Sequence, residues 1–161
     1  MIDPPDDRPA SPERGDAAIM VRDAAESDTS AMAALAAELG YPATPEEMRR
    51  RWARVSRDQR ARVLVATLGA ASAVVGLGTV HLLSTIHADT EVAQLTTLVV
   101  SERVRGSGVG RRLVAEAERW ARERGAARIV VTTALHRGGA HAFYERLGYA
   151  FTGRRYVRAL A

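Results

Sequence analysis

A glycine-rich turn is the feature of this sequence whose residue types and spacing most clearly predict chemistry. An apolar run ends at Val100, and residues 105–111 then read RGSGVGR before an amphipathic segment begins. Glycine lets the main chain approach a bulky anion because no Cβ atom stands in the way. A helix that starts in such a turn offers unpaired N–H groups and the positive end of its dipole. The pattern therefore predicts a pyrophosphate cradle flanked by arginine charge.

Two familiar phosphate-binding loops do not fit this turn. The Rossmann fingerprint, Gly-x-Gly-x-x-Gly, would need a glycine where Arg111 stands. The Walker A loop needs a lysine, and the sequence contains none. Taken alone, the turn has a plainer interpretation, which is a tight loop with solvated arginines.

A second segment carries a tyrosine that could serve as an acid. Residues 140–149 read AHAFYERLGY. Phe143 and Leu147 are spaced as one helical turn, and they predict the buried stripe of a short helix. Tyr144 follows Phe143 and therefore projects from another side of that helix. Without further context, Tyr144 is a packing residue with its hydroxyl at the rim of the core.

Hydrophobic periodicity and helix stop signals predict the elements that must position these residues. Strands are expected over 19–23, 62–68, 73–83, 92–100 and 128–134, with one or two more over 149–160. Helices are expected over 26–39, 44–55, 111–124 and 139–147, and Thr44 with Glu47 three residues later predicts a capping box at the start of the second helix. Helices alternate with strands only in the second half, which favours a mixed α/β sheet with helices on both faces.

Composition limits the class of protein. The chain has 161 residues, 47% of them hydrophobic and 26% charged, as in an ordinary soluble domain. We expect a disordered tail over 1–18 and a single domain over 19–161. The chain contains no cysteine, so disulfides, cysteine-based metal sites and an acyl-cysteine intermediate are excluded, and we expect no metal. No run approaches the roughly 20 apolar residues that span a bilayer, so we expect no membrane partner and a cytoplasmic location.

The net charge of +4 is carried by arginine in place of lysine, and it suits an anionic ligand such as a phosphate-bearing cofactor. A basic stretch from Arg49 to Arg62 raises nucleic-acid binding as a rival function. Trp52 and Val55 within it predict a packed helix face with solvated arginines opposite. We therefore expect no nucleic-acid partner.

Together the two motifs resemble the GNAT superfamily of N-acetyltransferases. Arg105-x-x-Gly108-x-Gly110 is similar to that family's (Gln/Arg)-x-x-Gly-x-(Gly/Ala) signature. Residues 140–149 resemble its Ala-x-x-Phe-Tyr-x-x-x-Gly-(Phe/Tyr) segment, and the two motifs occur in the family's order. The resemblance covers about residues 19–160. It implies a central mixed, mostly antiparallel sheet of six to seven strands flanked by about four helices.

The resemblance also implies a site for acetyl-coenzyme A (acetyl-CoA). The strand ending at Val100 would splay from the strand starting near Arg128, and the pantetheine arm would lie in the gap. The turn would hold the pyrophosphate, an N–H near Val99 would polarise the thioester carbonyl, and Tyr144 would stand near the sulfur. Arg137 stands where the family often has asparagine, so it would reach a phosphate or remain solvated. The expected cofactor contacts are Leu98, Val99, Val100, Arg105, Gly106, Ser107, Gly108, Val109, Gly110, Arg111, Arg137 and Tyr144.

The implied reaction is direct transfer of the acetyl group to a primary amine in a ternary complex. A fixed main-chain donor would stabilise the oxyanion, and Tyr144 would donate a proton to the departing thiolate. The base stays open, because Gln94 stands where many relatives place glutamate. Glu91 is the first candidate, directly or through water. His81, His87 and an amine that needs no side-chain base are the alternatives.

The sequence leaves the acceptor open, and small-molecule amines are the first expectation. The first two helices and the loop 84–90 would form its wall, where acidic residues would favour a cationic amine. A protein or peptide N-terminus is one alternative, and a non-catalytic sensor that binds CoA is another. A homodimer is compatible with the sequence. The residues singled out on the acceptor side are Tyr41, Glu46, Glu47, Asp89 and Glu91.

Overall fold

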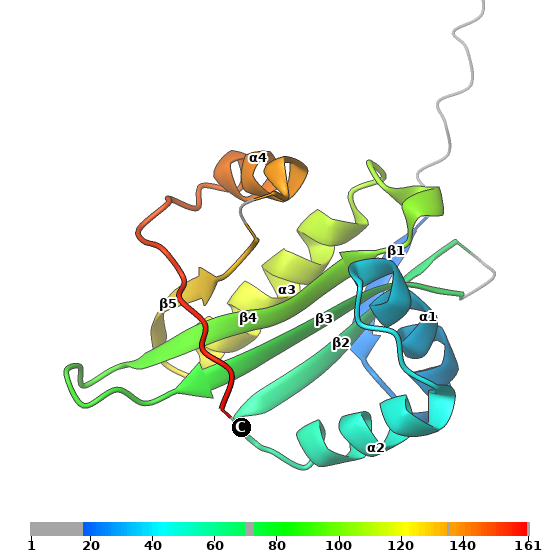
Figure 1. Cartoon of the computed structure of the whole chain (residues 1–161), viewed down its shortest axis with the longest axis horizontal. Helices are drawn as coiled ribbons and strands as arrows, with labels where there is room; N and C mark the ends of the chain where they lie inside the picture. Colours follow the sequence, from blue (N-terminus) through cyan, green and yellow to red (C-terminus); the bar gives the residue numbers. More distant parts are fainter. Residues whose placement is uncertain (1–17, 70–72, 135, 161) are drawn as a thin grey trace, which may run out of the picture.

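The computed structural model describes residues 18–69, 73–134 and 136–160, and the tail expected over 1–18 lies, except for its last residue, outside them. Within the described residues, one sheet has the strand order β1-β2-β3-β4-β5 (Figure 1). The strands are β1 Ile19–Asp23, β2 Ala61–Leu68, β3 Val74–Leu83, β4 Glu91–Val100 and β5 Ala126–Val131. The α-helices are α1 Thr29–Leu39, α2 Pro45–Val55, α3 Val109–Glu123 and α4 Gly138–Arg146, with short 3₁₀ helices η1 Glu26–Asp28 and η2 Glu102–Val104.

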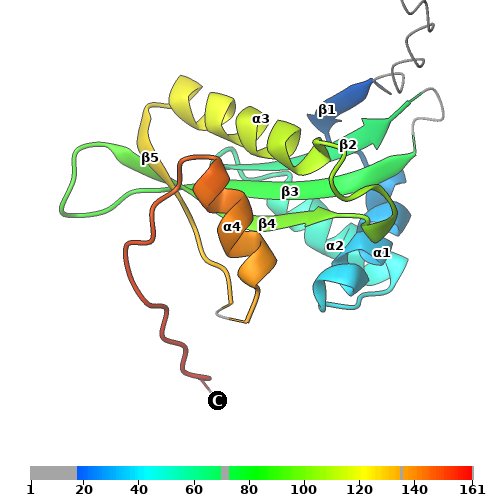
Figure 2. The same cartoon turned by 90° about the horizontal axis from the view of Figure 1, so that it is seen from above.

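The sheet is mixed and mostly antiparallel, as predicted. Strands β1 to β4 pair antiparallel with their neighbours, and β5 pairs parallel with β4 after the crossover through α3. The expected count of six or seven strands was too high, because the described part of the sheet has five. The strands expected over 149–160 are absent from the described residues, where 150–160 are exposed and project from the molecule (Figure 2). Strand-forming residues become a strand only when another strand pairs with them.

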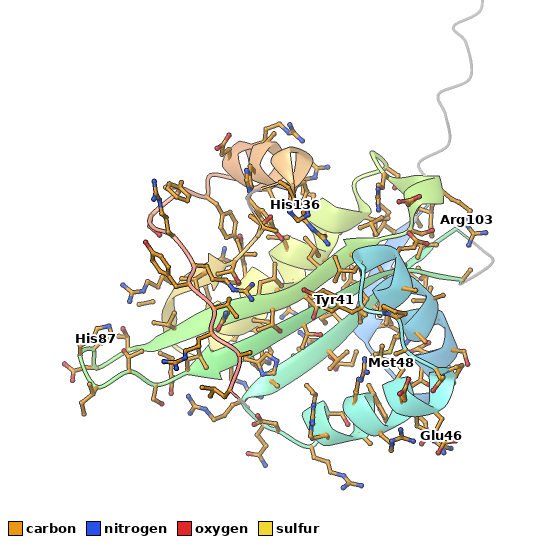
Figure 3. All side chains as sticks on the ribbon, viewed as in Figure 1. Tyr41, Glu46, Met48, His87, Arg103 and His136 are labelled. Carbon is orange, nitrogen blue, oxygen red and sulfur yellow. The ribbon has the colours of Figure 1, made fainter. Side chains whose placement is uncertain are left out.

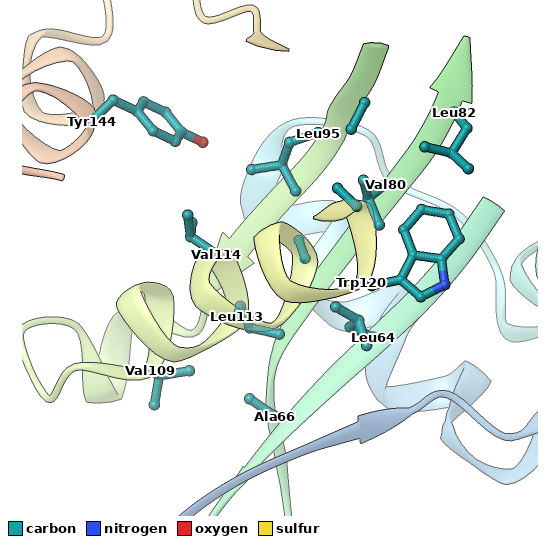
Figure 4. Packing of buried hydrophobic residues seen from close by; sticks show 13 residues of the cluster. Leu64, Ala66, Val80, Leu82, Leu95, Val109, Leu113, Val114, Trp120 and Tyr144 are labelled. Atoms are coloured by element: carbon teal, nitrogen blue, oxygen red, sulfur yellow. The ribbon is translucent and has the colours of Figure 1, made fainter. Parts of the chain in front are cut away.

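Helices cover both faces of the sheet. Helices α1 and α2 lie on one face, and α3 lies on the other (Figure 2). Leu113, Val114 and Trp120 of α3 pack against Leu64 and Val80 (Figure 4). The opposite face is covered by a second cluster, which includes Met32, Leu35, Met48, Val65, Leu77 and Val99.

Two local features of the sequence explain how the helices are placed. The predicted capping box starts α2, because Thr44 N–H donates to Glu47 Oε2 at 2.8 Å and Glu47 N–H donates to Thr44 Oγ1 at 3.2 Å. Gly76 of β3 permits the close approach of α3, since a Cβ there would lie 2.9 Å from both Leu113 Cδ1 and Val109 Cγ1. Gly76 therefore sets the position of the first turn of α3, which the site requires.

Candidate active site

Strands β4 and β5 lie side by side over only half the length of β4. Their parallel pairing runs from Glu91–Ala126 to Leu95–Val131 and ends there. Residues 97–100 keep their partners on β3, but among the described residues no strand faces their other edge. The predicted splay is confirmed, although β5 starts at Ala126 rather than near Arg128. The main-chain groups on this open edge of β4 are available to a ligand.

A β-bulge lies at the point where the two strands separate. Thr79 pairs with Thr97 and Val80 pairs with Leu95, so Thr96 is the extra residue on β4. Thr96 Oγ1 also donates a hydrogen bond to Thr79 O at 3.2 Å. A bulge bends its strand and increases the local twist. It therefore gives a physical reason for β4 to turn away from β5 at this residue, which the sequence pattern did not indicate.

The glycine turn forms the start of α3 and leaves its first N–H groups open. Gly106 has a φ of 83° and Gly108 a φ of 90°, a left-handed conformation that favours glycine. Gly108 occupies the N-cap position, where it has no side chain to cap the helix. Among the described residues, the main-chain N–H groups of Val109 to Arg111 have no acceptor. The start of α3 can therefore receive an anion, as the sequence predicted.

The three glycines of the turn have different surroundings. A Cβ on Gly106 would meet no atom within 4 Å, and one on Gly108 would lie 3.7 Å from Ile19 Cδ1. A Cβ on Gly110 would approach Phe143 Cζ to 3.3 Å, so Gly110 provides room for α4 to pack against α3. Gly106 and Gly108 thus shape the cradle itself, whereas Gly110 holds the helix that carries Tyr144.

The arginines beside the turn place positive charge around it. Arg105 folds back toward the end of β4, with its Nε donating to Val100 O at 3.3 Å and its Nη1 3.2 Å from Glu102 Oε1. Arg111 and Arg112 are exposed on the first turn of α3. Their charges add to the helix dipole in attracting an anion.

Glu38 of α1 secures the start of the turn. Its Oε1 accepts from Ser101 Oγ at 3.2 Å and its Oε2 accepts from Glu102 N–H at 2.8 Å. Ser101 is 3% exposed, and its N–H also donates to Val75 O at 2.8 Å. No sequence pattern indicates this contact, since Glu38 and Glu102 are 64 positions apart. Helix α1 is thereby tied to the cradle.

Tyr144 lies on α4 with its ring in the core and its hydroxyl directed toward Leu95 of β4 (Figure 4). The residue is 8% exposed, and burial raises the pKa of Tyr144 to about 12. Its ring packs edge-on against the Phe143 ring, with the two centroids 5.1 Å apart. It is tilted against the Tyr149 ring, with the two centroids 5.4 Å apart. The hydroxyl is therefore a fixed, neutral donor beside the residue at which β4 and β5 separate.

Glu91, the first candidate for the base, lies at the other end of β4 from the splay. Glu91 Oε2 accepts from Arg60 Nη2 at 2.7 Å, and Ser84 Oγ lies 3.3 Å from Oε1. These contacts, the Arg60 hydrogen bond above all, lower the pKa of Glu91. A carboxylate held in this way is a weak proton acceptor.

The histidine alternatives differ in position. His87 lies at the tip of the β3–β4 loop, away from α4 (Figure 3). His81 pairs with Gln94 of β4, two residues before the bulged Thr96, and with Ala61 of β2. Paired side chains share a face of the sheet, and Ala61 lies two residues before Val63, which packs under α1 and α2. His81 is therefore on the face expected for the acceptor.

Two further side chains from the second motif have structural partners. Arg137 Nη2 donates to Leu39 O at 2.7 Å, which ties the start of α4 to the end of α1. His141 Nε2 lies 3.1 Å from Ala134 O and holds the turn before α4. On the acceptor side, Glu47 belongs to the capping box of α2, and Glu46 lies 3.4 Å from Arg50. These acidic side chains are engaged in α2 itself.

Thr133 carries an orphaned polar atom near the splay. Its Oγ1 is buried and has no hydrogen-bond partner among the described residues. Thr133 lies two residues beyond Val131, the last paired residue of β5. Buried hydroxyl groups are normally hydrogen-bonded, so we expect the Thr133 hydroxyl to be available to a ligand bound in the splay. The sequence did not single out Thr133, because a lone threonine after a strand carries no pattern.

Comparisons with known proteins agree with this geometry. A family model described as "Acetyltransferase (GNAT) family" matches residues 25–149. An aminoalkylphosphonate N-acetyltransferase from Salmonella typhimurium is 36% identical over 87 residues, 54% of this chain and 56% of that protein. The match therefore spans little more than half the length of this relative.

No helix among the described residues is long and apolar enough to cross a bilayer.

Solved structures share the fold at low identity. A protein named as a transcriptional regulator from Bacillus halodurans has a TM-score of 0.82 at 24% identity, covering 89% of this chain and 100% of that one. An aminoglycoside N-acetyltransferase determined in complex with CoA has a TM-score of 0.79 at 15% identity, covering 94% and 99%. At such identities the likeness establishes the fold alone.

Replacing Thr133 tests whether its hydroxyl belongs to a ligand site. Thr133→Val should leave thermal stability unchanged or higher, because the hydroxyl has no hydrogen-bond partner among the described residues. It should weaken CoA binding about 10-fold in a calorimetric titration, because one hydrogen bond to the ligand is lost.

Thr85→Val is the matched control. Thr85 Oγ1 is likewise buried without a described partner, but it lies in the β3–β4 loop beyond the far end of β4. Thr85→Val should leave CoA affinity unchanged. Unchanged CoA affinity in Thr133→Val, with a loss of stability, would show instead that the Thr133 hydroxyl serves only the fold.

Proposed function

The chain belongs to the acetyltransferase (GNAT) family, and from that premise we propose that it transfers the acetyl group of acetyl-CoA to the primary amine of a small molecule. The proposed route is direct attack in a ternary complex. One observation carries the proposal: the open edge of β4 leads directly to the unpaired N–H groups of α3. An elongated ligand with amide groups along one arm and a diphosphate at its end matches both features at once.

The residues present fit acetyl-CoA, which supplies an acetyl group activated as a thioester. The N–H groups from Gly106 to Arg111 would hold the diphosphate, with Arg105 as a nearby positive charge. The open edge formed by Leu98 to Val100 would pair with the pantetheine arm, and the Thr133 hydroxyl would receive one of its polar groups. In this proposal Arg137 acts by holding α1 beside the site, because its guanidinium donates to Leu39 O.

Two fixed donors would act where negative charge develops. A main-chain N–H near Val99 would stabilise the carbonyl oxygen, because the donor is oriented before the charge appears. Tyr144 would donate a hydrogen bond to the departing sulfur. With a pKa of about 12 for Tyr144 and about 8.5 for a free thiol, complete proton transfer would cost about 5 kcal/mol. Tyr144 therefore stabilises the thiolate as a neutral donor more than as a source of a proton.

Removal of the amine proton falls to His81 in this proposal. His81 lies on the α1–α2 face beside the start of the splay, whereas Glu91 is bound to Arg60 at the far end of β4. An amine that arrives deprotonated is the second route, because the amine proton can also leave to water.

The amine acceptor is proposed to be small and to carry an anionic group of its own. The named activity of the Salmonella typhimurium relative supports this choice. The acidic residues of α2 lend no support to a cationic acceptor, since Glu46 and Glu47 have partners within that helix. Aminoalkylphosphonates and amino acids are therefore the first compounds to examine.

Removing the Tyr144 hydroxyl separates turnover from cofactor binding. Tyr144→Phe should lower kcat about 100-fold, because the thiolate loses its donor, while the Kd for CoA stays within about twofold of wild type. Because the pKa of Tyr144 is raised to about 12, the hydroxyl stays protonated up to that pH. Below about pH 11, the rates of wild type and of Tyr144→Phe should therefore depend on pH in the same way.

Tyr149→Phe controls for the loss of a buried tyrosine hydroxyl. Tyr149 packs on Tyr144, and its hydroxyl donates to Glu118 Oε1 at 2.9 Å. Its replacement should cost about 1 kcal/mol of stability but leave kcat near wild type. If Tyr144→Phe turned over as fast as Tyr149→Phe, the donor role of Tyr144 would be refuted. Wild-type protein that binds CoA but turns over no amine would favour the non-catalytic sensor.

A thiol-release assay over a panel of amines tests the proposed acceptor class. The panel contains aminoalkylphosphonates, amino acids, polyamines, an aminoglycoside and a peptide with a free N-terminus. We expect kcat/KM to be highest, by at least about 10-fold, for a small amine with an anionic group. A preference for the peptide or for the polyamines would contradict the proposed substrate class while leaving the acetyl-transfer reaction intact.

A further inference from the structure

Half of one face of the sheet has no helix over it among the described residues. Helices α1 and α2 cover the part of this face where Val65, Leu77 and Val99 are buried. The other half, where β3 ends and β4 and β5 begin, is bare of helices (Figure 1). Residues 150–160 pass in front of it in Figure 1, but Figure 2 shows that the end of this segment stands apart from the sheet. This uncovered half borders the splay between β4 and β5.

The packing of β5 shows which of its side chains project from the uncovered half. Ile129 and Val131 pack against the core cluster under α3, on the opposite face of the sheet. Successive side chains of a strand point to opposite faces. Arg128 and Val130 therefore project from the uncovered half, and both are exposed.

Two rows of side chains cross the uncovered half. Each row consists of residues that are partners in the pairing of β3, β4 and β5. The first row is His81, Gln94 and Val130, and the second is Leu83, Val92 and Arg128. The first row lies nearer the splay, because the pairing of β4 with β5 ends at Leu95, the residue after Gln94. A row with two polar side chains beside the splay is thus followed by an apolar row that ends in a cation.

Arg128 differs from the other arginines of the described strands in having no carboxylate partner. Arg22 of β1 lies 2.6 Å from Asp28, and Arg62 of β2 lies 2.8 Å from Glu116. Arg128 forms no ion pair with any described carboxylate. A guanidinium presents a planar set of donors that matches the oxygens of a carboxylate or a phosphate. Arg128 can therefore pair with an anionic group of a ligand that lies on the uncovered half.

We propose that Arg128 binds the anionic group of the acceptor and so determines which amines the protein acetylates. The inference rests on the proposed function, which places the amine beside His81 and the splay. The alkyl chain of the acceptor lies on the apolar side chains of Val92 and Val130, and its anionic group pairs with Arg128. A cationic group at the same place is repelled, so polyamines and aminoglycosides are unfavourable acceptors.

The spacing of the strands favours a short acceptor. Neighbouring strands lie about 4.8 Å apart and a strand rises about 3.3 Å per residue. Arg128 is two residues before Val130, the partner of Gln94, so the Cα atoms of Arg128 and Gln94 are about 8 Å apart. His81 is one strand further away, at about 12 Å from Arg128 between Cα atoms. The two side chains extend toward each other over this distance, which leaves room for an amine and an anionic group joined by a short alkyl chain.

Turnover of matched amines tests the role of Arg128. 2-Aminoethylphosphonate and β-alanine carry an anionic group, and ethanolamine has a neutral hydroxyl in its place. Arg128→Gln should raise KM for the two anionic amines at least about 10-fold, because a charged hydrogen bond is lost. It should leave kcat near wild type, since Arg128 does not contact the reacting atoms, and leave kcat/KM for ethanolamine within about twofold. Arg128→Lys should recover part of the loss, because lysine keeps the charge but not the planar donors.

Arg51→Gln is the matched control for the change in net charge. Arg51 is exposed on α2, which covers the other half of the same face, and it forms no ion pair with a described carboxylate. Its replacement should leave KM unchanged for all three amines. If Arg51→Gln and Arg128→Gln raised KM for the anionic amines equally, the effect would come from net charge and the assignment of Arg128 would be wrong.

Binding of the anionic group can be measured without turnover. Ethylphosphonate has the anionic group but no amine, and phosphorus NMR follows its binding to wild type and to Arg128→Gln, each with and without CoA. We expect the Kd to be at least about 10-fold higher for Arg128→Gln. Equal Kd values, or no binding to wild type, would overturn the proposal. Wild type that binds ethylphosphonate through Arg128 but acetylates no amine would instead contradict the acetyl transfer and leave the anion site in place.

Discussion

The proposed ligand site depends on the unpaired main-chain N–H groups at the first turn of α3. Three features of the described structure serve to place them. Gly76 lets α3 lie close on the sheet, the left-handed Gly106 and Gly108 form the turn, and Glu38 holds the start of that turn from α1. In the described part of the chain no side chain caps the helix, because its N-cap is glycine. These N–H groups can therefore donate to a bound anion.

The splay between β4 and β5 is the second constraint, and it has a local cause. The bulge at Thr96 turns β4 where its pairing with β5 ends, so an open main-chain edge leads toward the cradle. Helix α4 returns across this opening and brings Tyr144 toward Leu95. In the proposed complex, the ligand would run along this open edge from the tyrosine hydroxyl to the helix N-terminus.

The parts of this arrangement that arise from local sequence could be predicted. The glycine turn and the capping box of α2 were expected with their residues, and α2 ends at Val55 as expected. The bulge at Thr96 and the Glu38 contacts could not be predicted, because they depend on pairing and packing between residues distant in sequence. Arg137 and Glu91 have partners in Leu39 and Arg60 that no spacing indicates. The C-terminal residues favour a strand, but among the described residues no strand pairs with them.

Calorimetric titration of CoA into two glycine variants tests whether the turn before α3 binds the diphosphate. Gly106 and Gly125 both have left-handed φ angles, 83° and 79°, and a Cβ on either meets no atom within 4 Å. Alanine should therefore cost each variant a similar strain of about 1–2 kcal/mol. We expect Gly106→Ala to lose at least about 10-fold in CoA affinity, because its Cβ obstructs the diphosphate, and Gly125→Ala to bind as wild type. Equal affinities in the two variants, or no heat of binding with folded wild-type protein, would show that the turn does not hold the diphosphate.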